Sequence, residues 1–175
     1  SPIFILVALL IKIEDKGPIF YRHKRSGLYG KDFILTKIRS MKVNAENNGA
    51  TWAKKSDPRI TKVGFLIRKT RLDELPQLWS VLIGNMSLIG PRPERPEIDK
   101  VLLNKIPYYS LKYTLKPGLS GWAQVNYKYG ASIQDAEAKL SYEIFYVRNQ
   151  SFLLDILIFF KTIKLIINME GSEPS

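Results

Sequence analysis

Two apolar segments, one near each end of the chain, set the main limit on its fold. The first runs through residues 3–11 without a polar side chain. As a helix it would rise ~14 Å, about half the thickness of a hydrocarbon core, so it cannot span a bilayer. It also lacks the charged region that begins a signal peptide. Two interpretations remain open: a buried core helix, or one half of a longer membrane element that bends at Pro2.

The second apolar segment covers residues 151–168 and is interrupted by Asp155, Lys161, Thr162 and Lys164. These interruptions argue against a simple spanning helix. On a helical wheel the polar residues gather on one side, which is the pattern of a helix lying in a membrane surface. A helix packed on a soluble core has the same periodicity. Two apolar ends around a basic stretch nevertheless favour a membrane-surface protein. The apolar face of the helix comprises Phe152, Ile156, Phe159, Phe160, Ile163, Ile166 and Ile167.

The excess positive charge is confined to one stretch of the chain. The 175 residues include 27 Lys and Arg against 16 Asp and Glu, a net charge of +11. Residues 12–71 hold 16 basic and 5 acidic side chains, so the whole excess lies in these sixty residues. A basic stretch of this kind suits nucleic acid, an anionic membrane or a phosphorylated substrate.

The scarcity of two residue types excludes several kinds of chemistry. The chain has no Cys and a single His, His23, which we interpret as structural or exposed. Disulfide frameworks, thiolate nucleophiles, Cys-based zinc sites and multi-His metal sites are therefore excluded. Any catalysis must depend on Asp, Glu, Lys, Arg, Ser, Thr or Tyr. The length is that of one domain with a substantial core.

The middle of the chain predicts short elements separated by loops. Apolar runs at residues 19–21 and 33–38 are bounded by turn residues and predict two strands joined through a glycine-containing loop. Residues 44–57 are polar and predict a loop, and residues 62–69 predict a helix. Residues 116–126 read as a loop whose glycines allow it to cradle a ligand or to form a packed turn.

Asp73 and Glu74 stand at the start of a predicted helix that ends at Gly84. Thr70 and Asp73 have the spacing of a capping box, and Pro76 requires that the regular helix begin late. The positive end of a helix dipole and the neighbouring basic residues favour ionised carboxylates. An exposed, ionised carboxylate among cations is what a phosphoryl-attacking nucleophile or a Mg²⁺ ligand needs. For an isolated pair of this kind, ordinary acidity at a helix N-terminus is the favoured interpretation.

Three prolines within residues 91–96 predict a stiff extended or turn segment. Such a segment holds Arg92 and Arg95 in fixed positions, and guanidinium groups bind phosphate in a bidentate manner. A connector with solvated charges is the alternative. Further on, Tyr142, Phe145 and Tyr146 predict the core face of a helix.

Several of these segments together resemble a known family. Residues 37–41 (KIRSM), 70–93 (TRLDELPQLWSVLIGNMSLIGPRP) and 116–126 (KPGLSGWAQVN) look like the bacterial sugar transferases. These are monotopic polyprenyl-phosphate hexose-1-phosphate transferases, also called phosphoglycosyl transferases. The resemblance covers nearly the whole chain, and residues 51–64 resemble the branch that initiates exopolysaccharide and O-antigen synthesis, whose members often carry further N-terminal transmembrane helices.

The resemblance implies a role for each matching residue. Asp73 would be the nucleophile on the β-phosphate of a UDP-sugar, releasing UMP and leaving a phosphosugar on the enzyme; polyprenyl (undecaprenyl) phosphate would then attack this intermediate. Glu74 would assist with proton handling or metal placement, and Mg²⁺ is the implied cofactor, held by Asp73 and Glu74. Arg92, Lys37 and Arg68 would bind substrate phosphates.

The resemblance also implies where the chain resides. Ser1 and Pro2 match the break of a re-entrant membrane helix, of which residues 1–11 would be the outgoing half. Residues 12–168 would form one cytosol-facing catalytic domain with an interfacial helix at 151–168, followed by a tail at 169–175. The expected location is the cytoplasmic face of the bacterial inner membrane. The expected partners are a UDP-sugar, the polyprenyl phosphate and the phospholipid bilayer, with no nucleic acid; a homo-oligomer is one option for the assembly.

The expected fold class is α+β, a mostly helical membrane-associated domain with a small β-hairpin. Two other functions compete with the transferase. A nucleic-acid-binding protein would use the basic stretch and bind with steep salt dependence, although no RNA- or DNA-binding signature is present. A catalytically silent membrane-surface module would bind lipid without needing Asp73 and Glu74.

Overall fold

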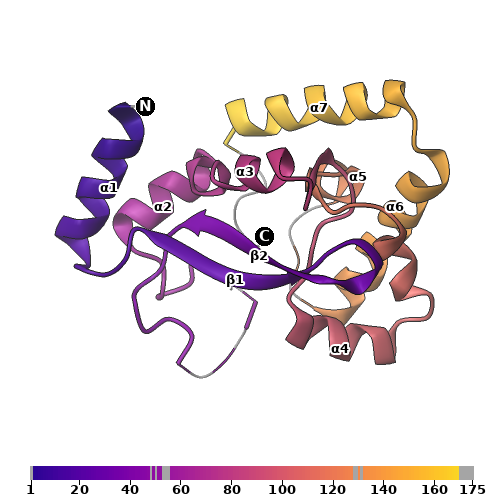
Figure 1. Cartoon of the computed structure of the whole chain (residues 1–175), viewed down its shortest axis with the longest axis horizontal. Coiled ribbons are helices and arrows are strands. Elements are labelled where there is room, and N and C mark those ends of the chain that lie inside the picture. Colours follow the sequence, from indigo (N-terminus) through magenta and orange to yellow (C-terminus); the bar gives the residue numbers. More distant parts are fainter. Residues whose placement is uncertain are drawn as a thin grey trace.

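The computed structural model of the chain describes residues 2–47, 49, 51–52, 56–127, 130 and 132–169, and its α+β class agrees with the sequence-based prediction (Figure 1). In chain order the elements are α1 (Pro2–Glu14), β1 (Phe20–Ser26), η1 (Leu28–Gly30), β2 (Asp32–Ile38), α2 (Lys62–Lys69), η2 (Leu72–Glu74), α3 (Gln77–Leu82), β3 (Ser87–Ile89), α4 (Pro96–Lys105), η3 (Tyr109–Thr114), β4 (Gly118–Ser120), α5 (Trp122–Asn126), α6 (Ile133–Asn149) and α7 (Phe152–Ile167), where η denotes a 3₁₀ helix.

The predicted pair of strands is confirmed as an antiparallel hairpin of β1 and β2, in which Tyr21 lies opposite Lys37 and His23 opposite Leu35. Burial alternates along β1, because successive side chains of a strand point to opposite faces. Tyr21, His23 and Arg25 therefore share one face with Lys37 and face the interior of the molecule. This face forms one wall of the site described below.

Helix α1 contains the first apolar run and continues to Glu14. Val7 and Ile11 are buried in a small core with Ile38 and Ile67, whereas Ile5 and Leu6 are more than half exposed. None of the helices in the described part of the chain has the length and apolar character needed to cross a membrane. Pro2 is the first residue of α1, and Ser1, the other half of the predicted helix break, lies outside the described residues.

The predicted helix at residues 62–69 is confirmed as α2, and it is joined directly to α1. The two oxygens of Glu14 accept hydrogen bonds from the backbone N–H groups of Lys62 (2.7 Å) and Val63 (2.9 Å). These N–H groups have no partner within the helix, so the carboxylate caps them.

A second core joins α4, η3 and α6 and includes Leu102, Ile106, Tyr109, Tyr113 and Leu140. Two sequence-based predictions in this half are wrong in detail. Tyr146 is buried, but Phe145 is 45% exposed and stacks on Trp122 instead. Residues 116–126 are not one loop: they form β4, which pairs in parallel with β3, and then helix α5. Both strands are three residues long, too short to show an alternating pattern in the sequence.

Helix α7 confirms the predicted second apolar helix. Of its polar residues, Asp155, Lys161 and Thr162 are partly buried, whereas Lys164 is exposed. Lys161 Nζ donates to Asn126 Oδ1 of α5 (2.6 Å), and Thr162 Oγ1 hydrogen-bonds Ser120 Oγ of β4 (2.6 Å). The apolar face points out, with Phe152, Phe160 and Ile167 at least 63% exposed. Figure 1 shows α7 along the same side of the molecule as α3 and the N-terminal end of α1, which also carry exposed apolar residues.

Candidate active site

Asp73 and Glu74 lie in η2, the single helical turn between α2 and α3. Helix α2 ends at Lys69 and is capped by Thr70, whose Oγ1 donates to the carbonyl oxygen of Leu66 (2.9 Å). Arg71 then takes a left-handed conformation with φ of 58°. The proposed capping box of Thr70 and Asp73 is therefore wrong, because Thr70 closes the preceding helix instead of opening the next one. The sharp reversal at Arg71 turns the two carboxylates back toward strand β2.

The prediction that these carboxylates are exposed is also wrong. Asp73 is 5% exposed and Glu74 9%. The sequence pattern shows only that they begin a helical turn, whereas their burial results from the packing of η2 against β2, which lies more than thirty residues earlier in the chain. Burial removes water from both groups, so their charge depends on the neighbouring side chains.

Glu74 is surrounded by cations from three different segments of the chain. Its Oε1 accepts hydrogen bonds from Lys37 Nζ (2.6 Å) and Arg92 Nη2 (3.1 Å), and Arg71 Nη1 lies 3.6 Å from Oε2. Burial alone would raise the pKa of Glu74, but the positive charges of Lys37, Arg92 and Arg71 outweigh it. They hold the pKa well below its usual value, so Glu74 is ionised at neutral pH as the sequence-based analysis expected.

Asp73 behaves in the opposite way. Burial raises the pKa of its carboxyl group above the ordinary value, and the negative charge of Glu74 acts in the same direction. Lys37 and Arg68 oppose the shift without cancelling it. The neighbouring cations favour the ionised form of Asp73, as expected, but burial and Glu74 outweigh them and the pKa rises. The ionised carboxylate is held in a poorly hydrated environment, which makes it a more basic nucleophile than an aspartate in water.

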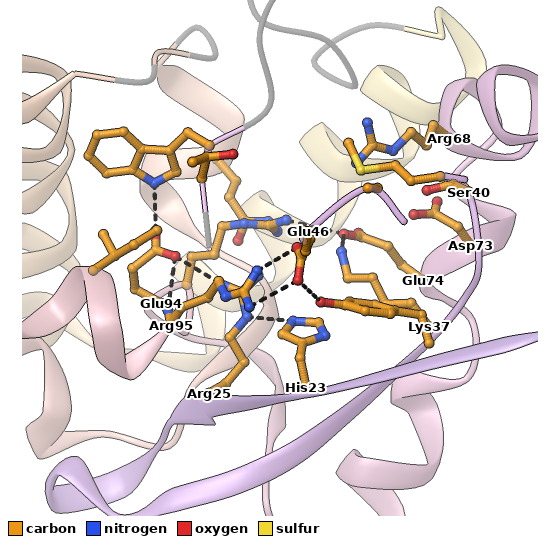
Figure 2. A pocket seen from close by; sticks show the side chains of 18 of the residues that line it. His23, Arg25, Lys37, Ser40, Glu46, Arg68, Asp73, Glu74, Glu94 and Arg95 are labelled. Atoms are coloured by element: carbon orange, nitrogen blue, oxygen red, sulfur yellow. Dashed lines mark hydrogen bonds and ion pairs between the residues drawn. The ribbon is translucent and has the colours of Figure 1, made fainter. Parts of the chain in front are cut away.

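The two carboxylates line a cavity of about 380 Å³, to which residues from both halves of the chain contribute. All five residues that the sequence singled out as catalytic or phosphate-binding, Lys37, Arg68, Asp73, Glu74 and Arg92, line it. Figure 2 shows Arg68, Ser40 and Asp73 on one side of this cavity, with Arg25, Glu94 and Arg95 on the other. The volume suits a ligand of nucleotide size.

Most residues on the second side of the cavity were not predicted from the sequence. Tyr21 Oη donates to Glu46 Oε2 (2.5 Å), and Arg95 Nη1 donates to Glu46 Oε1 (2.6 Å). Arg25 Nη1 donates to Glu94 Oε1 (2.8 Å) (Figure 2). Tyr21, His23 and Arg25 alternate along β1, and this alternation is the signal that would have placed these three side chains on one face.

His23 is part of this second side rather than a surface residue. Its Nε2 accepts a hydrogen bond from Arg25 Nε (2.8 Å), and its ring stacks on Tyr21 at 4.9 Å between centroids. Burial, together with the positive charges of Arg25 and Lys37, lowers the pKa of His23 to about 2. The ring is therefore neutral at physiological pH and supplies no positive charge to the cavity.

The donor set of the site fits a divalent cation only in combination with a substrate. Asp73 and Glu74 supply the hard oxygen ligands that Mg²⁺ prefers, and Mg²⁺ usually takes one or two carboxylates together with substrate phosphates and water. Within the described part of the chain, no group of three or more His, Cys, Asp or Glu side chains is placed to hold a metal alone. Phosphate oxygens would have to complete the coordination shell.

Comparisons with known proteins identify the family of the chain. The family model of the bacterial sugar transferases matches residues 1–169. The chain is 44% identical, over 99% of its length, to the UDP-N-acetylgalactosamine-undecaprenyl-phosphate N-acetylgalactosaminephosphotransferase of Aeromonas hydrophila. It is 39% identical, over 93% of its length, to the UDP-glucose:undecaprenyl-phosphate glucose-1-phosphate transferase of Escherichia coli K12. A protein with the latter name from Caulobacter vibrioides is 34% identical over 98% of the chain. The matched regions make up 41%, 36% and 65% of these three relatives. The extent of these matches establishes that the chain belongs to the bacterial sugar transferase family.

Proposed function

We propose that this chain transfers a sugar-1-phosphate from a UDP-sugar to a polyprenyl phosphate such as undecaprenyl phosphate, releasing UMP. The observation that carries the proposal is the position of Asp73, a buried carboxylate with a raised pKa that lines a nucleotide-sized cavity rich in cations. The names of the relatives supply the substrate class. The reaction would be the first membrane step of exopolysaccharide, O-antigen or other glycoconjugate synthesis.

In the first step, an oxygen of Asp73 attacks the phosphorus atom that carries the sugar. The bond from this phosphorus to the bridging oxygen breaks, UMP leaves with that oxygen, and an aspartyl phosphosugar remains. In the second step, an oxygen of the polyprenyl phosphate attacks the same phosphorus. The Asp73 carboxylate leaves, and the product is a polyprenyl diphosphate sugar.

The cations of the site neutralise the charge that these steps bring together, since anionic attack on a phosphoryl group is otherwise opposed by repulsion. Arg92 already contacts Glu74, and its side chain is 40% exposed, so it can also reach an incoming phosphate. Arg68 and Lys37 line the same cavity. Mg²⁺, held by Asp73 and Glu74 together with phosphate oxygens, would add charge neutralisation when bound.

The polyprenyl phosphate lies in a membrane, and contact with that membrane would cover the outward-facing apolar surface of α7. A helix that directs Lys161 and Thr162 inward and its phenylalanines outward exposes apolar area that water disfavours and a lipid surface would cover. We therefore propose that α7, α3 and α1 contact the cytoplasmic face of the inner membrane, with α1 as the outgoing half of a re-entrant helix.

The catalytic proposal is tested by UMP release from a panel of UDP-sugars with undecaprenyl phosphate and Mg²⁺. Asp73→Asn should abolish turnover, and mass spectrometry of the wild-type protein with UDP-sugar alone should find a phosphosugar on the Asp73 peptide. Asp32→Asn, which alters an exposed carboxylate in β2, is the control. Turnover that survives Asp73→Asn would show that the nucleophile is a different group.

The membrane proposal has a closely matched control within the chain. Leu157 on α7 and Leu103 on α4 are 45% and 46% exposed, and α4 lies on the opposite side of the molecule (Figure 1). In flotation with vesicles containing phosphatidylglycerol, Leu157→Glu should lower the bound fraction severalfold and Leu103→Glu should not. Equal losses in the two variants would contradict the proposed orientation.

A further inference from the structure

A buried ion pair lies beside the segment that carries Arg92, and both of its residues line the same cavity. Lys112 of η3 and Glu143 of α6 are each 5% exposed, and Lys112 Nζ lies 3.2 Å from Glu143 Oε2. Lys112 Nζ also donates to Tyr109 Oη (3.3 Å) and lies 4.9 Å from the centre of that ring. The pair is thus held between two helical segments next to the second core.

The other oxygen of Glu143 binds the backbone of Arg92. Glu143 Oε1 accepts a hydrogen bond from the Arg92 N–H at 3.1 Å. Pro91 and Pro93 have no backbone N–H, so Arg92 supplies the sole backbone donor of this tripeptide. Through this hydrogen bond, Glu143 attaches residues 91–93 to helix α6. On its other side, the carbonyl oxygen of Pro91 accepts from the Gly118 N–H (2.9 Å).

The side chain of Arg92 leaves this anchored backbone and enters the active site, where Nη2 donates to Glu74 Oε1. We infer that Glu143 is a positioning residue, which fixes the backbone of Arg92 so that its guanidinium group is held at the substrate phosphates, and that Lys112 orients Glu143 for this contact. The inference rests on the phosphate-binding role proposed for Arg92. It adds a residue that lines the cavity and acts on the substrate through the backbone of Arg92.

Stability alone gives a weak reason for a buried Lys–Glu pair. Replacing such a pair by apolar side chains of similar volume is often neutral or stabilising, because both charges lose their hydration on burial. What the apolar replacement would lose here is the acceptor for the Arg92 N–H. A misplacement of a catalytic group by about 1 Å can lower a rate about 100-fold, so the position of this backbone matters more to turnover than to folding.

The test compares two double variants that remove both charges of the Lys112–Glu143 pair. Lys112→Met is combined with Glu143→Gln, which keeps a side-chain oxygen for the Arg92 N–H, or with Glu143→Leu, which removes it. The kcat and KM for the UDP-sugar are measured by UMP release, and the melting temperatures are compared. The leucine variant should have a kcat/KM about 10- to 100-fold below the glutamine variant, at a similar melting temperature.

The same comparison in an Arg92→Ala background separates positioning from a general structural effect. Once the guanidinium group is gone, the ratio between the glutamine and leucine variants should fall below about threefold, because coupled residues are non-additive. A ratio that persists there overturns the positioning role and leaves the proposed function intact. If Arg92→Ala alone leaves kcat/KM within about twofold of wild type, the phosphate-binding role of Arg92 is itself wrong, and the inference is overturned with it.

A third variant covers the case in which the leucine variant does not fold. Glu143→Asp keeps the negative charge beside Lys112 but withdraws the oxygen from the Arg92 N–H. It should show the same loss of kcat/KM, again only when Arg92 is present. Wild-type kinetics in this variant would overturn the inference.

Discussion

The neighbouring carboxylates Asp73 and Glu74 should have opposite effects on stability when each is neutralised. Glu74 interacts favourably with three cations, whereas the ionised form of Asp73 is disfavoured by burial. We expect Glu74→Gln to lower the free energy of unfolding at neutral pH and Asp73→Asn to raise it. Both variants should lose most of their transferase activity, so stability and activity change independently of one another.

The size of the Glu74 effect follows from the burial of its partners. Removing one member of a fully buried ion pair costs about 3–5 kcal/mol. The side chains of Lys37, Arg71 and Arg92 remain 19%, 26% and 40% exposed, so water recovers part of their hydration. We therefore expect a loss of about 2–3 kcal/mol, which for a chain of this length lowers the melting temperature by about 4–12 °C.

The pH dependence of stability gives the sign of each carboxylate's effect independently. The folded-state pKa of Glu74 is lowered, so its contribution to stability is present above the ordinary glutamate pKa and is lost as the pH falls toward the lowered value. The difference in melting temperature between wild type and Glu74→Gln should therefore shrink on going from pH 7 to pH 4. The folded-state pKa of Asp73 is raised, so its ionisation lowers stability as the pH rises through the interval between the two values.

Thermal unfolding followed by circular dichroism between pH 4 and pH 8 tests both signs. Asp73→Asn should melt about 2–8 °C above wild type at pH 7, corresponding to about 1–2 kcal/mol. Asp32→Asn should change the melting temperature by no more than about 2 °C, because its carboxylate is exposed. Destabilisation by Asp73→Asn, or a Glu74→Gln effect that does not depend on pH, would refute the assignment of opposite environments.

Three further predictions concern the site and its supports. The acid limb of the kcat/KM–pH profile should lie above the ordinary aspartate pKa of about 3.9, because burial raises the pKa of Asp73 and only its ionised form attacks. An acid limb at or below that value would contradict the role of Asp73 as nucleophile. Gly64→Ala should destabilise the fold by about 1–3 kcal/mol in urea unfolding, since the added Cβ would overlap the carbonyl oxygen of Ser40; an unchanged midpoint would refute this close approach. Tyr146→Phe should cost about 1 kcal/mol and speed hydrogen exchange in α7, because it removes the 2.7 Å hydrogen bond to Asp155; unchanged exchange would show that this bond does not hold α7.

Local patterns were sufficient to predict several elements. The helix at residues 62–69 was predicted with the bounds of α2, since Val63, Leu66 and Ile67 recur at helical spacing. The hairpin followed from turn residues and β-formers, although β1 extends to Ser26, five residues beyond its apolar core. The bounds of α7 lie within one residue of the predicted apolar segment.

Long-range packing accounts for what the sequence did not reveal. Glu46 meets Arg95 across 49 residues, and Glu143 meets Arg92 across 51. No local spacing encodes such contacts. Periodicity also could not tell which face of α7 points inward: an amphipathic helix on a soluble core would bury its phenylalanines, whereas this one buries Ile158 and exposes Phe160. Both the long-range contacts and the orientation of α7 depend on the elements that pack against each segment, and not on the segment's own sequence.

The opposite pKa shifts of Asp73 and Glu74 follow from the positions of the neighbouring cations. Lys37 and Arg92 donate hydrogen bonds to Glu74, and Arg71 pairs with it, so their strongest interactions lower the pKa of that residue. Asp73 receives their field at longer range and loses more to burial than it regains. Neighbouring titratable groups whose environments drive their pKa values apart are typical of paired catalytic roles. Were the same cations bonded to Asp73 directly, its oxygens would be stabilised and less nucleophilic. Glu74 therefore serves the proposed attack by keeping the cations within reach of the phosphates while leaving Asp73 available to react.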